Sequence, residues 1–79
     1  MKNPKIIDIY NNVVYSKIVD DHGEGITYYG FARPGAYCSD SVWRILRGDS
    51  STNPATFFYA EGNSNFIHVW DSRTNYLYH

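Results

Sequence analysis

The chain has little of several features that mark common classes of small protein. It contains one cysteine, Cys38, so it cannot form an internal disulfide bond. No apolar run approaches the roughly 20 residues that a membrane-spanning helix needs, and the N-terminus lacks the apolar stretch of a signal peptide. These absences predict a chain that is made and stays in a reducing cytoplasm, without a membrane partner.

Neither sign of charge dominates the composition. Seven basic and eight acidic side chains give a formal net charge of -1, and the basic residues are scattered along the chain. A surface for nucleic acid needs several cations together, because each of them neutralises a phosphate. The six glycines form no phosphate-binding G-x-G-x-x-G or Walker pattern either. A nucleic-acid partner is therefore not indicated.

Candidate catalytic and metal-binding groups are few and dispersed. Cys38 could act as a nucleophile only beside a base, and the sequence places none of the three histidines next to it. Residues 20–24 gather three carboxylates and an imidazole, but they lack the length and spacing of a calcium loop. The spacing of His68 and Asp71 favours a surface hydrogen bond over a zinc site. We expect no catalytic residue, no metal site and no cofactor.

Aromatic rings are what the chain has in abundance. Eight tyrosines, four phenylalanines and two tryptophans occur among 79 residues. The core of so small a domain usually supplies only about 3 to 5 kcal/mol, and a disulfide, a metal or an oligomeric interface often supplements it. Since disulfides are excluded and metal ligands are not clustered, association is the remaining source of stability. We predict that some of the rings face a partner.

Runs of β-branched and aromatic residues, separated by glycine-rich and polar segments, predict a mainly β fold. The expected architecture is a small antiparallel sheet, barrel or sandwich of five or six short strands, with one short helical turn near residues 64–72. The polar residues 1–4 predict a flexible N-terminal arm that precedes a single β domain over residues 5–79. Strands are expected over residues 5–10, 13–19, 26–32, 42–47, 56–60 and 76–79.

Two segments leave room for interpretation. Residues 63–73 fit one or two helical turns, because apolar residues recur at a helical spacing, but the run 66–70 is equally typical of a strand. Within residues 26–32, alternation places Thr27, Tyr29 and Phe31 on one face. The other face carries the small residues Gly30 and Ala32, which leave space for a large ring from an adjacent strand or chain.

The rings and their apolar neighbours divide into a predicted core and a predicted contact set. Tyrosine combines rigid apolar area with a polar tip, so it suits a contact surface. The predicted core residues are Tyr29, Phe31, Trp43, Ile45, Phe58, Phe66, Val69 and Trp70. The predicted interface residues are Tyr10, Tyr15, Tyr28, Tyr59, Tyr76 and Tyr78.

Four short motifs carry a resemblance to a known group of proteins. They lie at residues 29–35, 41–45, 60–66 and 69–73, and are followed by Leu77 and Tyr78. This order resembles short tailed-bacteriophage proteins with Y-x-G-x-A-x-P-G, V-W-R-I, A-D-G-N-x-x-F and V-W-D-x-R motifs. The resemblance covers about residues 26–78, and the chain departs from it in having Glu61 where Asp is usual and Cys38 in a connecting loop.

The resemblance implies a phage setting and a role in the virion or its assembly, without an active site. The leading hypothesis is a non-enzymatic structural or accessory protein that docks on virion subunits in the head, neck or tail, or on itself as a homo-oligomer. It would be assembled into the virion in the host cytoplasm. The alternative is a small intracellular phage binder that sequesters a host protein or a nucleotide-like ligand.

Overall fold

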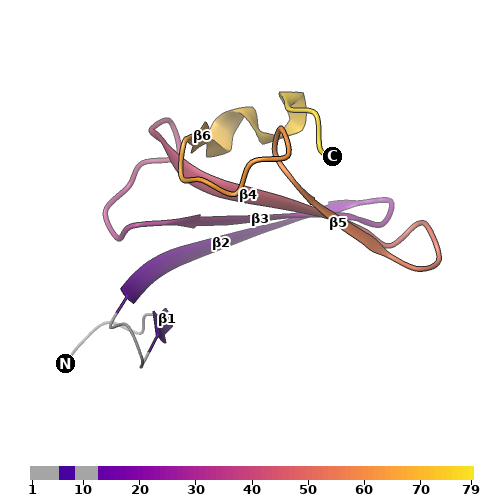
Figure 1. The fold of residues 1–79 in the computed structure, drawn as a ribbon, viewed down its shortest axis with the longest axis horizontal. Helices are drawn as coiled ribbons and strands as arrows, with labels where there is room; N and C mark the ends of the chain where they lie inside the picture. Colours follow the sequence, from indigo (N-terminus) through magenta and orange to yellow (C-terminus); the bar gives the residue numbers. More distant parts are fainter. Residues whose placement is uncertain (1–5, 9–12) are drawn as a thin grey trace.

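The chain folds into an open antiparallel sheet, seen in a computed structural model that describes residues 6–8 and 13–79 (Figure 1). Strands β1 to β5 pair in sequence order, and β6 pairs with β4. The prediction of a mainly β fold with one short helical element is confirmed. Residues 1–4 and Tyr10 lie outside the described residues. The elements are β1 (Ile6–Asp8), β2 (Val13–Gly23), β3 (Ile26–Ala32), β4 (Ser41–Asp49), β5 (Thr56–Tyr59), β6 (His68–Val69) and the 3-10 helix η1 (Trp70–Asn75).

The β2–β3 hairpin is longer than its sequence predicts. The predicted strand ends at residue 19, but Asp20 and Asp21 also belong to β2 and pair with β3. The reversal is confined to Glu24 and Gly25, whose φ angles are 57° and 82°. Two consecutive positive φ angles are what a two-residue hairpin turn requires to match the twist of its strands. The strand therefore runs to Gly23, and its acidic end lies on the sheet.

The segment that fitted either a helix or a strand contains both. His68 and Val69 form β6, and the chain then turns into η1 at Trp70. The predicted strand over residues 76–79 is reduced to a single antiparallel bridge between Ala60 and Tyr78. As a result, the C-terminal segment crosses one face of the sheet (Figure 1). Its side chains Trp70 and Tyr78 are part of the core on that face.

This covered face holds the hydrophobic core. Trp70 is 4% exposed and lies over Gly30, where an added Cβ would be 2.6 Å from its ring. The expected space for a large ring at Gly30 is thus occupied by a residue of the same chain. The Trp43 and Trp70 ring centroids are 6.0 Å apart. The buried hydrophobic residues are Tyr28, Ala32, Trp43, Ile45, Ala60, Trp70 and Tyr78.

Polar contacts fix η1 against β2. Arg73 donates from Nε to Asp20 over 3.0 Å, and its guanidinium lies 4.5 Å from the Trp70 ring. The hydroxyl of Tyr78 donates to the carbonyl of Arg73 over 2.6 Å. Desolvation raises the pKa of Asp20, but hydrogen bonds with Arg73 and His22 outweigh it and hold that pKa below its ordinary value. Burial raises the pKa of Tyr78, so its hydroxyl stays a donor.

Candidate docking surface

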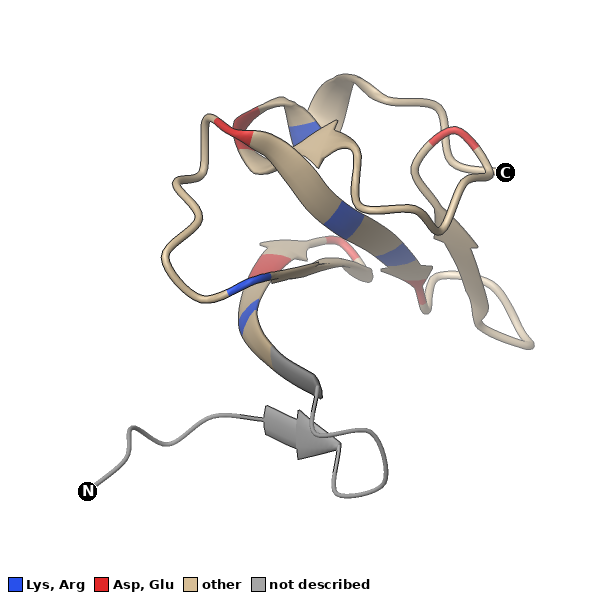
Figure 2. Cartoon of the chain, turned by 60° about the vertical axis from the view of Figure 1, so that its left-hand side comes forward, with Lys and Arg blue, Asp and Glu red and all other residues tan. Residues whose placement is uncertain are grey.

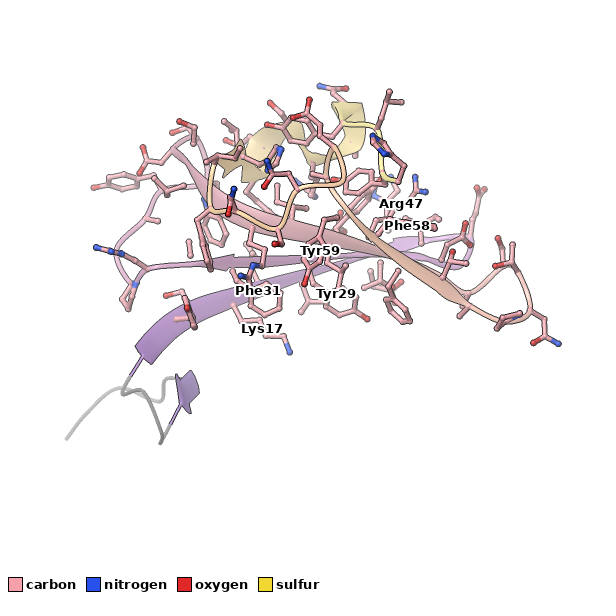
Figure 3. All side chains as sticks on the ribbon, viewed as in Figure 1. Lys17, Tyr29, Phe31, Arg47, Phe58 and Tyr59 are labelled. Carbon is pink, nitrogen blue, oxygen red and sulfur yellow. The ribbon has the colours of Figure 1, made fainter. Side chains whose placement is uncertain are left out.

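The sheet has a second face, opposite η1, which we call the open face. Figure 3 shows Tyr29, Phe31 and Lys17 on this side, whereas Arg47 and Phe58 lie on the side of the C-terminal segment. The pairing register places alternate residues of four strands on it. Its residues are Lys17, Val19 and Asp21 of β2, Thr27, Tyr29 and Phe31 of β3, Arg44, Leu46 and Gly48 of β4, and Phe57 and Tyr59 of β5.

The open face is built from three rows that run across the strands. In the central row Val19 pairs with Tyr29, Tyr29 with Leu46, and Leu46 with Tyr59, so the row is entirely apolar or aromatic. One flanking row, the bulky row, contains Lys17, Phe31 and Arg44. The other flanking row, the small row, contains Asp21, Thr27 and Gly48, and ends at Phe57.

Apolar side chains on the open face are strongly exposed. Phe57 is 59% exposed and Val19 is 51% exposed, while Tyr29, Leu46 and Tyr59 are half-buried. Contiguous exposed apolar area on a small folded protein marks a site of contact with another molecule, because water leaves such area unfavourably solvated. The open face therefore has the character of a docking surface.

The segment around Phe66 borders the bulky row. Arg44 donates from Nε to the carbonyl of Ser64 over 2.7 Å, and its guanidinium lies 4.5 Å from the Phe66 ring. Tyr15 stacks on the Phe66 ring, with the two ring centroids 5.4 Å apart and the two planes 4° apart. These contacts hold the Arg44 head in place at one end of the open face.

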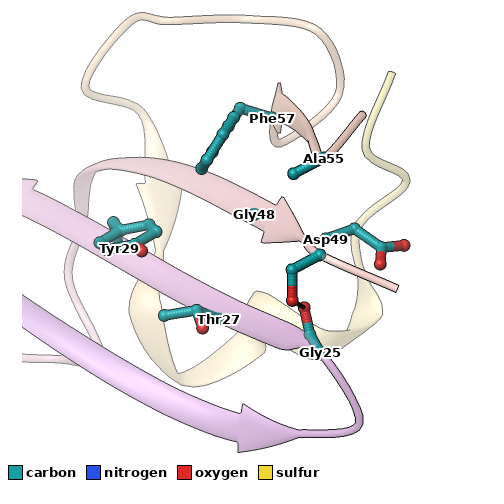
Figure 4. Close-up of a pocket in the computed structure, with 8 residues that line it drawn as sticks. Gly25, Thr27, Tyr29, Gly48, Asp49, Ala55 and Phe57 are labelled. Atoms are coloured by element: carbon teal, nitrogen blue, oxygen red, sulfur yellow. Dashed lines mark hydrogen bonds between the residues drawn. The ribbon is translucent and has the colours of Figure 1, made fainter. Parts of the chain in front are cut away.

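A small pocket marks the other end of the open face. It has a volume of about 70 Å³ and lies over Gly48, between the rings of Tyr29 and Phe57 (Figure 4). Thr27 and Asp49 contribute to its rim. Hydrogen bonds from the Ser51 hydroxyl and amide lower the pKa of Asp49, so its carboxylate stays ionised at this end of the sheet. A pocket of this size accepts one side chain of a partner rather than a drug-sized ligand.

The predicted interface tyrosines are divided between the two faces. The prediction is wrong for Tyr28 and Tyr78, which are 7% and 8% exposed and belong to the core. Tyr59 is half-buried on the open face, and Tyr15 is half-buried against Phe66 at its border. Tyr76 is half-buried, and its hydroxyl accepts a hydrogen bond from the amide of Val69 over 2.9 Å.

The predicted core is correct for the residues that face η1 and wrong elsewhere. Trp43, Ile45 and Trp70 are buried as expected. Phe58 is 40% exposed, because it lies on the edge strand beyond the reach of η1. Tyr29 and Phe31 are half-buried on the open face, and Phe66 and Val69 are half-buried as well. The C-terminal segment is long enough to cover one side of the sheet only, so Tyr29 and Phe31 on the other side stay outside the core.

Sequence reasoning missed several residues of the docking surface: Lys17, Val19, Asp21, Leu46 and Phe57. Their signal is the alternation of β2 and β4, which places Val19 and Leu46 on the same side as Tyr29. Alternation was recognised within residues 26–32, but the register that joins the strands comes from long-range pairing.

The groups considered for catalysis are held in structural contacts. His68 is buried, and its Nε2 lies 3.0 Å from a carboxylate oxygen of Glu61, so the predicted surface hydrogen bond with Asp71 is wrong. Cys38 is half-buried, and its backbone carbonyl accepts a hydrogen bond from the amide of Asp71 over 3.1 Å. Across residues 6–8 and 13–79, no three His, Cys, Asp or Glu side chains are grouped to hold a metal ion.

Figure 2 shows Lys and Arg distributed over β2, β4 and η1, with Asp and Glu between them. In the described part of the chain, no helix has the length and apolarity needed to cross a membrane.

No family model, curated protein or solved structure matches the chain.

Proposed function

We propose that this chain is a non-enzymatic docking protein of a tailed-bacteriophage particle, which binds virion subunits, including further copies of itself, through the open face and an exposed strand edge. The observation that carries the proposal is the open face itself. One side of the sheet has its own cover in η1, while the other presents an apolar central row to solvent. Burial of such a row against a second protein is favourable in proportion to its apolar area.

The edge strand β5 supplies a second element of the docking surface. It stands last in the strand order of the sheet, and its residues Phe57 and Phe58 are exposed on opposite faces. An edge strand offers unpaired backbone groups to an extended segment of another protein, and flanking rings add apolar contact. The bridge between Ala60 and Tyr78 closes the edge just beyond β5, which confines this site to Thr56–Tyr59.

The phage setting is supported by the motif order over residues 26–78, and mass spectrometry of purified particles tests it. We expect the chain in particles of the phage that encodes it, at a fixed copy number relative to another subunit. Val19→Glu, which puts a charge in the central row, should lower its incorporation by about tenfold. Leu77→Glu is the matched control, because Leu77 is 75% exposed on the C-terminal segment.

Absence of the wild-type chain from the particles would contradict the virion role. Detection only in infected cells, bound to a host protein, would instead support the sequestering binder. Equal incorporation of the Val19→Glu and Leu77→Glu variants would show that the open face is not the docking surface.

A further inference from the structure

We propose that the partner which covers the open face is a second copy of this chain, packed face to face about a two-fold axis. This inference rests on the proposed docking role of the open face and names its occupant. Two antiparallel sheets commonly pack in this way, about 10 Å apart and with their strands within about 30° of each other. The open sheet described above is then one half of a β-sandwich.

The pattern of charge on the open face is complementary to itself. Lys17 and Asp21 lie on the same strand and the same face, on either side of Val19. A two-fold axis between the sheets, running along the central row, places β2 antiparallel to β2 of the second copy. Lys17 of each copy then faces Asp21 of the other, which gives two equivalent ion pairs. Both side chains are exposed, and neither forms an ion pair with another described residue.

In the same arrangement, large side chains of one copy face small side chains of the other. The same axis places the bulky row of one copy opposite the small row of the other. Phe31 then faces Thr27 of the second copy, and Arg44 faces Gly48. The pocket over Gly48, about 70 Å³ and lined also by Thr27, receives the end of the Phe31 side chain of the other copy. The apolar central rows meet at the axis, where each is buried by the central row of the other copy.

The extent of the face sets the strength of the association. Three rows about 6.8 Å apart on four strands about 4.8 Å apart give a flat footprint of roughly 400 Å² per copy. Interfaces of this size belong to the weak class, so we expect a dissociation constant in the micromolar range, on the order of 10 to 100 µM. The measurement must therefore extend over a wide range of concentration.

Light scattering on the full chain, from about 1 µM to 1 mM, tests the arrangement by charge reversal. The wild type should shift from monomer to dimer over this range. Lys17→Asp creates two like-charge contacts, and so does Asp21→Lys, so each should weaken the dimer by about tenfold. The double variant Lys17→Asp/Asp21→Lys restores opposite charges across the axis and should recover an affinity within about threefold of the wild type. Leu77→Glu should leave the dimer unchanged.

Several results would overturn the proposal. A wild-type chain that stays monomeric at 1 mM, single variants that dimerise like the wild type, or a double variant that does not recover would each do so. Circular dichroism identifies a variant that fails to fold, and the reciprocal single variant then serves as the test. A monomer that is nevertheless found in particles would refute the dimer and leave the docking role intact. A chain that dimerises as expected but is absent from particles would support the dimer and refute the docking role in the virion.

Discussion

Replacing Trp70 by alanine is expected to leave half or less of the protein folded at room temperature. Removal of a buried tryptophan typically costs about 3 to 5 kcal/mol, through lost burial and the cavity that remains. The core of a domain of this size supplies only about that much in total. Trp70 is the central residue of this core, since it fills the space over Gly30 and packs against Trp43 and Arg73.

Urea unfolding followed by circular dichroism measures this effect, with Leu77→Ala as the control. Leu77 is 75% exposed, so its truncation should change the free energy of unfolding by no more than about 0.5 kcal/mol. A Trp70→Ala protein whose free energy of unfolding lies within about 1 kcal/mol of the wild type would show that η1 is not required for folding.

The second large effect is expected from Gly30→Ala, which adds one methyl group beneath Trp70. The added Cβ would lie 2.6 Å from the Trp70 ring and 2.8 Å from a methyl carbon of Ile18. Because the indole is buried and fixed by its neighbours, the strain cannot be relieved by a simple rotation. Overpacking of this kind costs about 1 to 3 kcal/mol.

Gly48→Ala is a matched control with a similar clash on the opposite face. Its Cβ would lie 2.8 Å from the ring of Phe57, but that ring is 59% exposed and can turn into solvent. We expect Gly48→Ala to cost less than about 1 kcal/mol in free energy of unfolding. Trp70→Phe should also reduce the cost of Gly30→Ala in a double-mutant cycle, since the smaller ring makes room for the methyl group. Equal costs at the two glycines would contradict the assignment of covered and open faces.

Much of this fold could be predicted from local patterns. The β-branched and aromatic runs located β3 without error, because this signal acts over a few residues. The end of β2 was missed, since Asp20 is retained on the sheet by Arg73, a contact across 53 residues. The sequence also leaves open whether the segment at Trp70 is a strand or a helix, because η1 is held on the sheet by the same long-range contact between Arg73 and Asp20.

The faces of the sheet could not be assigned from the sequence alone. Alternation separated Tyr28 from Tyr29 correctly, but the choice of which residue is buried depends on which face η1 covers. The small residues Gly30 and Ala32 on the Tyr28 side were the available clue, because a covering ring needs space beneath it. Composition favoured tyrosines as contact residues, and that preference misplaced Tyr28 and Tyr78.

The central claim is that the two faces have separate roles, one in folding and one in binding. The most direct test is the free energy of unfolding of Val19→Glu, measured at about 1 µM, where a weak dimer is dissociated. Val19 lies in the middle of β2 on the open face and is 51% exposed. The account predicts a value within about 1 kcal/mol of the wild type, together with loss of association at high concentration. A loss of about 3 kcal/mol or more, comparable to that of Trp70→Ala, would show that the open face belongs to the folding core and would contradict the account.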